Sequence, residues 1–307
     1  MYHIIVNPVA GNGGTVKQIP FITNLFDNAN MQYEVLLTEG ILDGYEKTKA
    51  ICKKGSLGII GVGGDGTIQE IIAGMADIFP MQHIPIPLGV YPAGSGKDLY
   101  MSLVGKKAAL QFYKDMQTDK AARQFFKIVK ENRTKAIDYI VVNDMAYLNI
   151  GNIGLDARIV KNASAVKQKY GRYAYIAAVY KSILQHTNMP LEIEVNDKIY
   201  KEEYTLVAVC NGKYYGGGLE ISPYSCIDDG KIHVCFVKAM SKPKTMALFP
   251  TLMIGKHTIL KAVHFTTCKE LKITLPPNET LCLDGNLYPK EGILHYKLFE
   301  KGINIFI

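Results

Sequence analysis

Short apolar runs alternate with amphipathic stretches over the first third of the chain. Four of these runs have the length and composition of buried strands, at residues 3–6, 33–37, 57–62 and 86–91. Three stretches between them have helical periodicity, at residues 16–28, 44–53 and 68–75. In the last of these, Ile68, Ile71, Ile72 and Met75 recur at the spacing of one helix face. This alternation predicts a parallel sheet with helices on both faces.

From about residue 130 the pattern changes to closely spaced strands. Strands are predicted at 138–143, 146–150, 191–195, 205–209, 232–237, 271–275 and 303–307. Asn196-Asp197 suits a tight hairpin turn before a strand at 199–204. One long helix is predicted over 170–184. A β-rich second domain, either a sandwich or a barrel, is therefore expected, with the basic stretch 127–135 joining it to the first.

Composition fits this two-domain organisation. The chain has 307 residues, 48% hydrophobic and 21% charged, which is typical of globular proteins and excludes general disorder. Six cysteines form no C-x-x-C pair and predict reduced residues of a cytoplasmic protein, and no Cys/His cluster suggests zinc. No secretory leader and no run of about 20 apolar residues is present, so we expect no integral membrane segment.

The net charge of +7 favours contact with an anionic surface, but charge alone does not separate a membrane from a nucleic acid. Basic residues crowd the stretch between Lys106 and Lys135, which fits either membrane docking or an ordinary solvated helix face. Only the net charge favours nucleic acid, so we expect no nucleic-acid partner. The oligomeric state stays open, a homodimer included.

The candidate chemistry lies in Gly-rich loops that follow the predicted strands. The strongest is Gly63-Gly64-Asp65-Gly66-Thr67, between a strand and a helix. Helix N-termini present unpaired N–H groups that suit phosphate, and glycines let the backbone approach it closely. A carboxylate beside phosphate calls for a metal ion between them, so Asp65 favours metal-assisted phosphoryl transfer. The alternative is a glycine turn capped by an aspartate.

Two further loops lie at the same predicted sheet edge. Ser95 and Asp98, in Pro92-Ala93-Gly94-Ser95-Gly96-Lys97-Asp98, have capping spacing, so Asp98 is either a cap or part of a shared nucleotide site. The loop from Asn7 to Gly14 matches neither G-x-G-x-x-G nor the P-loop pattern. Lys17 beyond it either reaches a phosphate or is simply exposed.

These loops together resemble the catalytic family of diacylglycerol kinases and sphingosine kinases, and within it the soluble bacterial lipid kinases. The carrying motifs are Asn7-Pro8-x-x-Gly11, Gly63-Gly64-Asp65-Gly66-Thr67 and Pro92-x-Gly94-Ser95-Gly96-x-Asp98. The second half agrees through residues 149–156, 216–230 and Leu283-Asp284-Gly285. The resemblance therefore spans almost the whole chain, in order.

The resemblance implies a three-layer α/β domain with a parallel sheet, like that of NAD kinases and phosphofructokinases, followed by an all-β sandwich domain. The implied ATP-binding domain is 1–128, joined by the returning segment 292–307, and the implied lipid domain is 129–291. The implied cofactors are ATP and Mg²⁺, with a lipid in the cleft between the domains. A structural Mg²⁺ is implied at Asp229 with the backbone oxygens of Cys226 and Lys231.

The candidate site residues follow from the loops and the resemblance. The expected catalytic residues are Asp65 and Asp98 for Mg²⁺, Asp284 for orienting or deprotonating the lipid hydroxyl, and Asn286 at the family's base position. The expected nucleotide-binding residues are Asn7, Pro8, Val9, Ala10, Gly11, Lys17, Thr38, Gly63, Gly64, Asp65, Gly66, Thr67, Glu70, Gly94 and Ser95.

The chain departs from the family pattern at two positions. Lys97 stands where the family usually has Asn. Asn286 stands where the family has the glutamate implied as general base, and an amide does not accept a proton at neutral pH. Since positioning and charge stabilisation carry most of phosphoryl transfer, activity is compatible with this change.

The sequence therefore predicts a cytoplasmic, peripherally membrane-associated kinase that phosphorylates a hydroxyl of diacylglycerol or a related lipid. Two alternatives stay open: an NAD kinase-like enzyme, and a nucleotide- or lipid-binding regulator with impaired catalysis. The acceptor is not fixed, because diacylglycerol, a sphingoid base, a glycolipid and an undecaprenyl-type alcohol all present a hydroxyl.

Overall fold

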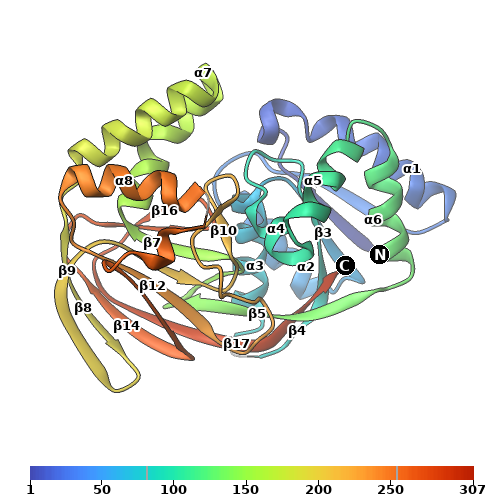
Figure 1. The fold of residues 1–307 in the computed structure, drawn as a ribbon. Coiled ribbons are helices and arrows are strands. Elements are labelled where there is room, and N and C mark those ends of the chain that lie inside the picture. Colours follow the sequence, from blue (N-terminus) through green and yellow to red (C-terminus); the bar gives the residue numbers. More distant parts are fainter. Residues whose placement is uncertain (81, 254) are drawn as a thin grey trace.

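The computed structural model describes residues 1–80, 82–253 and 255–307 (Figure 1). The first part is built on a parallel sheet with the strand order β4-β3-β1-β2. Its strands are β1 (Tyr2–Val6), β2 (Tyr33–Leu37), β3 (Gly58–Val62) and β4 (Ile84–Tyr91). The two central strands, β1 and β3, are buried over almost their full length, which explains their unbroken apolar sequences.

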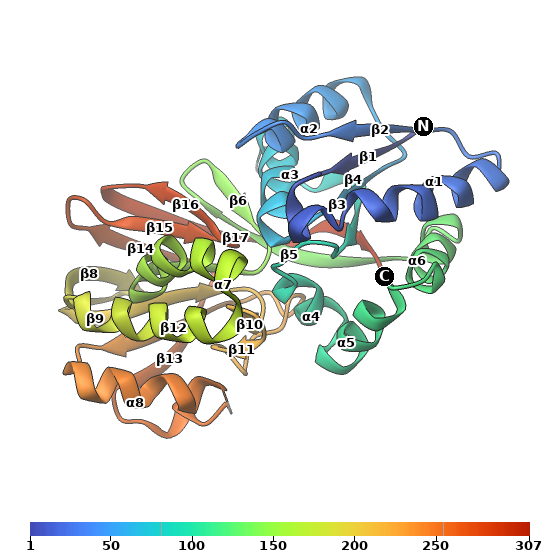
Figure 2. The same cartoon turned by 90° about the horizontal axis from the view of Figure 1, so that it is seen from above.

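Helices cover both faces of this sheet, which gives three layers (Figure 2). The longer helices are α1 (Ile19–Asn28), α2 (Asp43–Lys54), α3 (Asp65–Ile78), α5 (Lys106–Asp115) and α6 (Lys120–Lys130). The shorter ones are α4 (Asp98–Val104), η1 (Ala10–Gly13) and η2 (Val16–Gln18). Helices α2 and α3 pack together on one face, and α1 packs against α6 on the other. The predicted α/β architecture is confirmed.

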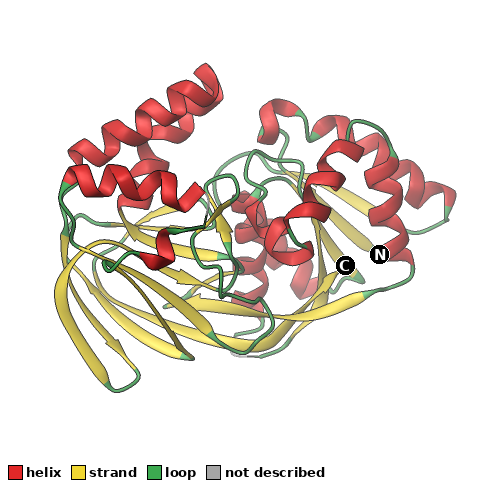
Figure 3. Ribbon diagram, in the orientation of Figure 1, coloured by secondary structure: helices red, strands yellow, loops and turns green. Residues whose placement is uncertain are grey.

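The second part is rich in strands (Figure 3). The strands before the long hairpin are β5 (Thr134–Val142), β6 (Met145–Tyr147) and β7 (Ile150–Gly154). The hairpin and the strands after it are β8 (Met189–Val195), β9 (Lys198–Cys210), β10 (Tyr214–Tyr215), β11 (Leu219–Glu220) and β12 (Ile232–Lys238). The last are β13 (Val263–Cys268), β14 (Glu270–Leu275), β15 (Thr280–Leu283), β16 (Asn286–Pro289) and β17 (Gly292–Phe306).

Two helices lie over one face of these strands, so the second part is β-rich rather than all-β. They are α7 (Leu155–Gln185) and α8 (Lys242–Met253), and a short η3 (His257–Ile259) follows. The helix predicted over 170–184 is the second half of α7, and α8 has no counterpart in the sequence prediction. The predicted strand 146–150 is divided between β6 and β7, because the backbone N–H groups of Leu148, Asn149 and Ile150 all bind the Asp284 carboxylate.

Strand β9 separates two apolar cores. Val207 and Val209 belong to the core enclosed by the strands of the second part, among them β8, β14 and β17. Leu206, Ala208 and Cys210 belong to the core that lies under α7 and α8. Side chains alternate across a strand, so a strand that is covered on both faces must be apolar at every position. The uninterrupted apolar end of β9 therefore reflects the two helices above it.

Strands β5 and β17 run from one part of the fold into the other. β17 pairs with β14 at its start and with β5 along most of its length, and its last residues pair parallel with β4. The buried Asp138 carboxylate accepts backbone N–H groups of Gly230 and Lys301, both at 2.7 Å, beside the register shift in β17. One continuous sheet therefore joins the two parts and fixes their relative position.

The hairpin predicted at Asn196-Asp197 is confirmed. Both residues have positive φ, at 50° and 59°, and β8 and β9 pair directly across them. Within the described residues, no helix is both long enough and apolar enough to span a membrane.

Candidate functional site

The three Gly-rich loops meet at the carboxyl ends of β1, β3 and β4. Gly94 N donates to Gly63 O at 2.8 Å, and Asn7 Nδ2 donates to Thr67 Oγ1 at 3.2 Å. A Cβ on Gly94 would lie 2.2 Å from Gly64 N, so only glycine permits this approach of the two backbones. The loops predicted to share one edge thus touch each other, because β3 and β4 are neighbours in the sheet.

Asp65 begins α3 and binds the start of α4. Its carboxylate accepts the backbone N–H of Asp98 at 2.9 Å and of Leu99 at 3.2 Å. Burial, followed by the nearby Asp98 carboxylate, raises the pKa of Asp65 well above its ordinary value. Asp65 therefore joins two of the Gly-rich loops in addition to any chemistry it performs.

Asp98 reaches from the first part of the fold into the second. Its carboxylate accepts the backbone N–H groups of Gly217 at 2.9 Å and Gly218 at 2.6 Å. Lys106 Nζ donates to the Gly218 carbonyl at 3.1 Å. Both glycines have φ above 90°, which disfavours any other residue there. The Gly216-Gly217-Gly218 loop is thereby attached to α4 and α5.

Asp284 organises the loop that precedes β7. It accepts backbone N–H groups from Leu148 at 3.0 Å, Asn149 at 3.2 Å and Ile150 at 2.7 Å. Burial raises the pKa of Asp284 to about 6, although these three hydrogen bonds oppose the rise. A carboxyl group with that pKa is ionised at neutral pH and is still a competent base.

Asn286 lies against α3. Its Nδ2 donates to the Gly66 carbonyl at 3.0 Å and to Gln69 Oε1 at 2.8 Å. Tyr288 also donates to Gln69 Oε1, at 2.8 Å, and Gln69 Nε2 donates to the Ala146 carbonyl at 3.1 Å. The amide at this position therefore bridges β16 to the helix that begins at Asp65.

Glu70 on α3 holds the start of α2 through its carboxylate. Its carboxylate accepts the backbone N–H groups of Leu42 at 3.0 Å and Gly44 at 3.1 Å, where α2 begins. Burial raises the pKa of Glu70. Glu70 thus fixes the loop that follows Thr38.

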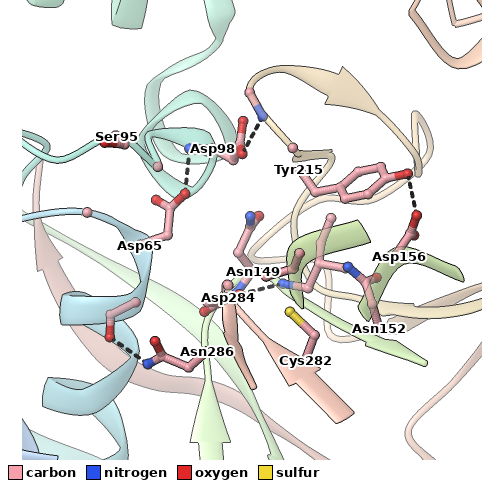
Figure 4. A pocket seen from close by; sticks show the side chains of 18 of the residues that line it. Asp65, Ser95, Asp98, Asn149, Asn152, Asp156, Tyr215, Cys282, Asp284 and Asn286 are labelled. Carbon is pink, nitrogen blue, oxygen red and sulfur yellow. Dashed lines mark hydrogen bonds between the residues drawn. The ribbon is translucent and has the colours of Figure 1, made fainter. Parts of the chain in front are cut away.

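One cavity of about 940 Å³ runs along all of these groups. Figure 4 shows Asp65, Ser95 and Asp98 on one side of it and Asp156 and Tyr215 on the other, with Asn149 and Asp284 between them. Its lining includes the following candidates: Asn7, Val9, Ala10, Gly11, Thr38, Gly64, Asp65, Gly66, Thr67, Glu70, Ser95, Asp98, Asp284 and Asn286. Pro8, Lys17, Gly63 and Gly94 lie outside that lining, and Lys17 is exposed.

The charge of the cavity wall has one sign. Six carboxylates line it: Glu39, Asp65, Glu70, Asp98, Asp156 and Asp284. None of the described lining residues is Lys, Arg or His. Lys97, at the position where the family has Asn, is also outside the lining, with its Nζ 4.3 Å from the centre of the Tyr113 ring. Burial lowers the pKa of this lysine.

The cavity continues from the Gly-rich loops into an apolar chamber under α7 and α8. Leucine, isoleucine, valine and phenylalanine side chains line this chamber: Leu155, Ile159, Val160, Ile183, Leu206, Leu219, Leu248, Phe249 and Leu252. The sequence analysis named none of them as site residues, and α8, which carries Leu248, Phe249 and Leu252, had no predicted counterpart. Asp156 carried a usable signal, since it closes the segment 149–156 that resembles the family.

The residues implied for a structural Mg²⁺ lie together in the turn before β12, away from this cavity. Asp229 accepts the backbone N–H of Lys231 at 3.1 Å and lies 2.8 Å from His233 Nε2, and Asp228 pairs with Lys135 at 2.8 Å. Asp229 N lies 3.5 Å from the Cys226 carbonyl oxygen. In the described part of the chain, no group of three or more His, Cys, Asp or Glu side chains is arranged to hold a metal.

Comparison with known proteins agrees with the predicted fold and family. Residues 1–142 match the diacylglycerol kinase catalytic domain, and residues 150–293 match the YegS C-terminal NAD kinase beta sandwich-like domain. A solved diacylglycerol kinase from Bacillus anthracis str. Sterne superposes with a TM-score of 0.73 at 22% identity, covering 99% of this chain and 96% of that one.

Curated relatives cover most of the chain at low identity. A diacylglycerol kinase of Mycobacterium tuberculosis (strain ATCC 25618 / H37Rv) is 25% identical over 283 residues, covering 89% of this chain and 84% of the relative. A diacylglycerol kinase of Bacillus subtilis (strain 168) is 24% identical over 298 residues, covering 96% of this chain and 93% of the relative.

The family matches place a diacylglycerol kinase catalytic domain before a beta sandwich-like domain, and residues of both line the same cavity. The two matched domains follow each other over almost the full length. The chain therefore belongs to the bacterial lipid kinase family with a diacylglycerol kinase catalytic domain.

Proposed function

We propose that this protein is an ATP-dependent lipid kinase, which transfers the γ-phosphate of ATP to a hydroxyl of diacylglycerol or a related lipid. The observation that carries the proposal is the continuity of the cavity. One end is formed by the Gly-rich loops at the strand ends and the other by an apolar chamber, with Asp65, Asp98 and Asp284 between them. Nucleotides bind at the carboxyl ends of parallel strands, and apolar chambers suit acyl chains.

The nucleotide is assigned to the loops around Asn7–Gly11, Gly64–Thr67 and Ser95. The phosphate is assigned to the start of α3 near Gly66, because helix N-termini suit anions, whereas the Thr67 N–H already donates to the Gly64 carbonyl at 3.0 Å. The close packing of Gly64 on Gly94 leaves no side chain between the backbone and a ligand there. Thr38, with its N–H on Val6 O, and Glu70 line the same end of the cavity.

The chemistry of the lining fits a divalent cation. Six carboxylates without a lysine, arginine or histidine among the described lining residues repel ATP on their own. Mg²⁺ prefers oxygen ligands and the company of phosphate, and Asp65 and Asp98 are the residues that would hold it. When bound, the ion would neutralise charge on the phosphates, as in other phosphoryl-transfer enzymes.

Asp284 is the candidate that removes the proton of the lipid hydroxyl. Its pKa of about 6 lies close to neutral pH, and it lines the cavity between the loops and the chamber. Asn286 is assigned a positioning role, because its amide binds Gly66 and Gln69 and has no basic lone pair at neutral pH. The hydroxyl oxygen then attacks the γ-phosphorus, ADP leaves, and the proton stays on Asp284.

The acceptor is expected to come from a membrane surface. The basic stretch predicted for docking lies on α5, α6 and the start of β5, and part of its charge is used internally. Lys106 binds Gly218, Arg123 pairs with Asp119, and Lys135 pairs with Asp228. The remaining lysines include Lys107, Lys114, Lys120 and Lys130. Stronger pelleting with anionic than with neutral vesicles is the expected behaviour, and equal pelleting would contradict electrostatic docking.

The test of the proposed function is ADP formation by the purified protein with Mg²⁺ and detergent-dispersed lipids. Asp65→Ala is the inactive comparison, and Asp144→Asn, an exposed turn carboxylate outside the cavity, is the matched control. Lipid-dependent turnover that Asp65→Ala abolishes supports a kinase. Measurable ATP binding without turnover on any lipid would instead favour a nucleotide-binding regulator.

A further inference from the structure

The start of α4 is held by residues outside that helix. Lys97 occupies the N-cap position of α4, and its side chain makes no capping hydrogen bond. Lysine is not among the residues that favour this position, whereas the asparagine usual in the family is one of them. The helix start is held instead by Asp65, which accepts two of its N–H groups, and by Tyr113 on the neighbouring helix α5.

Tyr113 contacts Lys97 through both its hydroxyl and its ring. The hydroxyl donates to the Lys97 carbonyl at 2.8 Å, and the same oxygen accepts the first backbone bond of α4, from Met101 N at 3.2 Å. The Lys97 Nζ lies 4.3 Å from the centre of the Tyr113 ring, which is a cation–π contact. The lysine side chain is half-buried, and such contacts are stronger where the cation has lost water.

The residue that follows Lys97 is Asp98, whose carboxylate lines the cavity and accepts the N–H groups of the Gly217–Gly218 loop. A shift of the Lys97 carbonyl moves Asp98 directly, because the two residues share a peptide bond. Burial, followed by the Asp65 and Asp98 carboxylates, raises the pKa of Tyr113, so its hydroxyl remains a donor at neutral pH. Tyr113 therefore holds the backbone immediately before the carboxylate proposed for Mg²⁺.

We propose that Lys97 and Tyr113 form a positioning pair that keeps Asp98 in place for Mg²⁺. This inference rests on the proposed function, because that function gives Asp98 the role of holding the metal. Lys97 is a positioning residue and not a phosphate ligand, since its Nζ lies over the Tyr113 ring and the residue is outside the cavity lining. The lysine that replaces the family's asparagine thus fixes the start of α4 through α5.

The experiment measures how much Mg²⁺ the protein needs in order to bind ATP. Calorimetric titration with ATP at a series of Mg²⁺ concentrations gives the midpoint of the Mg²⁺ dependence, with no lipid and therefore no lipid phosphorylation. Tyr113→Phe keeps the ring and loses the hydroxyl, whereas Lys97→Met keeps the length of the side chain and loses the charge. We expect each to raise the Mg²⁺ midpoint at least fivefold. Lys97→Arg keeps a cation over the ring and should stay within twofold of the native protein.

Two exposed residues outside the cavity provide matched controls. Tyr200→Phe removes a hydroxyl on the β8–β9 hairpin, and Lys54→Met removes a charge at the end of α2. Both should leave the Mg²⁺ midpoint within twofold. A purely structural defect would lower the fraction of the protein that binds ATP and would leave the midpoint unchanged, so these two quantities separate positioning from folding.

A double-mutant cycle tests whether the lysine charge acts through the tyrosine ring. In a Tyr113→Leu background, Lys97→Met should change the Mg²⁺ midpoint less than twofold, because the ring that the lysine contacts is already gone. An equal effect of Lys97→Met in both backgrounds overturns the pair. Should Tyr113→Leu not fold, the midpoints of Tyr113→Phe and Lys97→Met decide. In turnover assays, kcat should fall while KM for the lipid is unchanged, since neither residue lines the apolar chamber.

The outcomes separate this inference from the proposed function. Midpoints raised in Lys97→Met and Tyr113→Phe, without turnover of any lipid by the native protein, would keep the pair and sink the kinase. Lipid turnover by the native protein with unchanged midpoints in both variants overturns the pair and leaves the kinase. ATP binding that is independent of Mg²⁺ overturns the pair, because Asp98 then holds no metal. If ATP does not bind, both the pair and the kinase fail.

Discussion

Asn286 Nδ2 donates to Gln69 Oε1 at 2.8 Å, and the direction of that hydrogen bond is fixed by a third residue. Gln69 Nε2 is engaged by the Ala146 carbonyl, so its Oε1 must face Asn286 and Tyr288. The other partner of the Asn286 amide is the Gly66 carbonyl, also an acceptor. Both neighbours of position 286 are hydrogen-bond acceptors, so the side chain there must be a donor. The Asn286 amide has an NH₂ group to donate, whereas an ionised carboxylate has none.

Introducing a carboxylate at this position is expected to harm the protein. Asn286→Asp places an acceptor against two acceptor oxygens, so it should lower the free energy of unfolding by about 1–3 kcal/mol at neutral pH. Turnover should fall and not rise, although a base has been supplied. Urea unfolding and ADP formation measure the two effects.

Asn286→Ala is the comparison, because it removes the bridge without adding a charge. We expect it to be less destabilising at pH 8 than Asn286→Asp. An Asp or Glu variant of equal stability with a higher kcat would mean that position 286 still accepts a base.

Asp65 is expected to be needed for turnover and also to stabilise the loops. Asp65→Asn turns one carboxylate oxygen into an NH₂ facing the N–H of Asp98 or Leu99, which should cost roughly 1–3 kcal/mol. The charge that would hold a metal beside phosphate is lost as well, so kcat should fall at least 100-fold. A folded Asp65→Asn protein with normal ADP formation would remove Asp65 from the proposed mechanism.

The parts of the fold that the sequence predicted depend on local pattern. The strand–loop–helix junction at Asp65 and the turn at Asn196-Asp197 are determined by neighbouring residues, and both lie where expected. The meeting of the Gly63 and Gly94 loops followed from one further step, the neighbouring positions of β3 and β4. The family could also be predicted from the sequence, because its motifs are short and local and lie in these same loops.

The parts that were missed depend on contacts between distant residues. The strand predicted at 146–150 is interrupted by Asp284, more than 130 residues away in the chain. The donor requirement at Asn286 arises from Gln69 and Ala146, which no sequence pattern connects to it. Helix α8 contains Pro250, which weakens its helical signal, so the chamber beneath it was not predicted.

The acidic cavity wall predicts that ATP binding depends on a divalent cation. Removing Mg²⁺ with a chelator at constant ionic strength should weaken ATP binding at least tenfold, because the described lining has six carboxylates and no basic side chain. Adenosine carries no phosphate and is the matched control, whose affinity should not change. Calorimetric titration measures the affinity for each of the two ligands. Equal ATP affinity with and without the metal would contradict the prediction that the acidic lining repels ATP.

The contact between two Gly-rich loops predicts that Gly94 tolerates no side chain. A Cβ there would lie 2.2 Å from Gly64 N and 2.3 Å from Gly64 Cα, and backbone atoms cannot move aside as a flexible side chain would. Gly94→Ala should lower the free energy of unfolding by about 1–3 kcal/mol. Gly40→Ala, where a Cβ would meet nothing within 4 Å, should change it by less than about 0.5 kcal/mol. Equal urea midpoints for the two variants would contradict the close approach.

Asp156 should lower the free energy of unfolding of the ligand-free protein as pH rises. Burial raises the pKa of Asp156 to about 7, against an ordinary value near 4 in the unfolded chain. Between these two values the folded state binds more protons than the unfolded state, so stability falls as pH rises from about 4 to 7 and then levels off. For this fully buried group, the difference corresponds to an effect on the order of 4 kcal/mol.

Asp156→Asn removes that titration and keeps the shape of the side chain. The variant should therefore gain stability relative to the native protein as pH rises from 5 to 8, and the gain should be small at pH 4. Other carboxylates, such as Asp284, titrate in both proteins and cancel in the comparison. Thermal unfolding at matched pH values measures the difference. A difference that does not change with pH would mean that Asp156 is ionised at low pH, with its charge satisfied from within the chain.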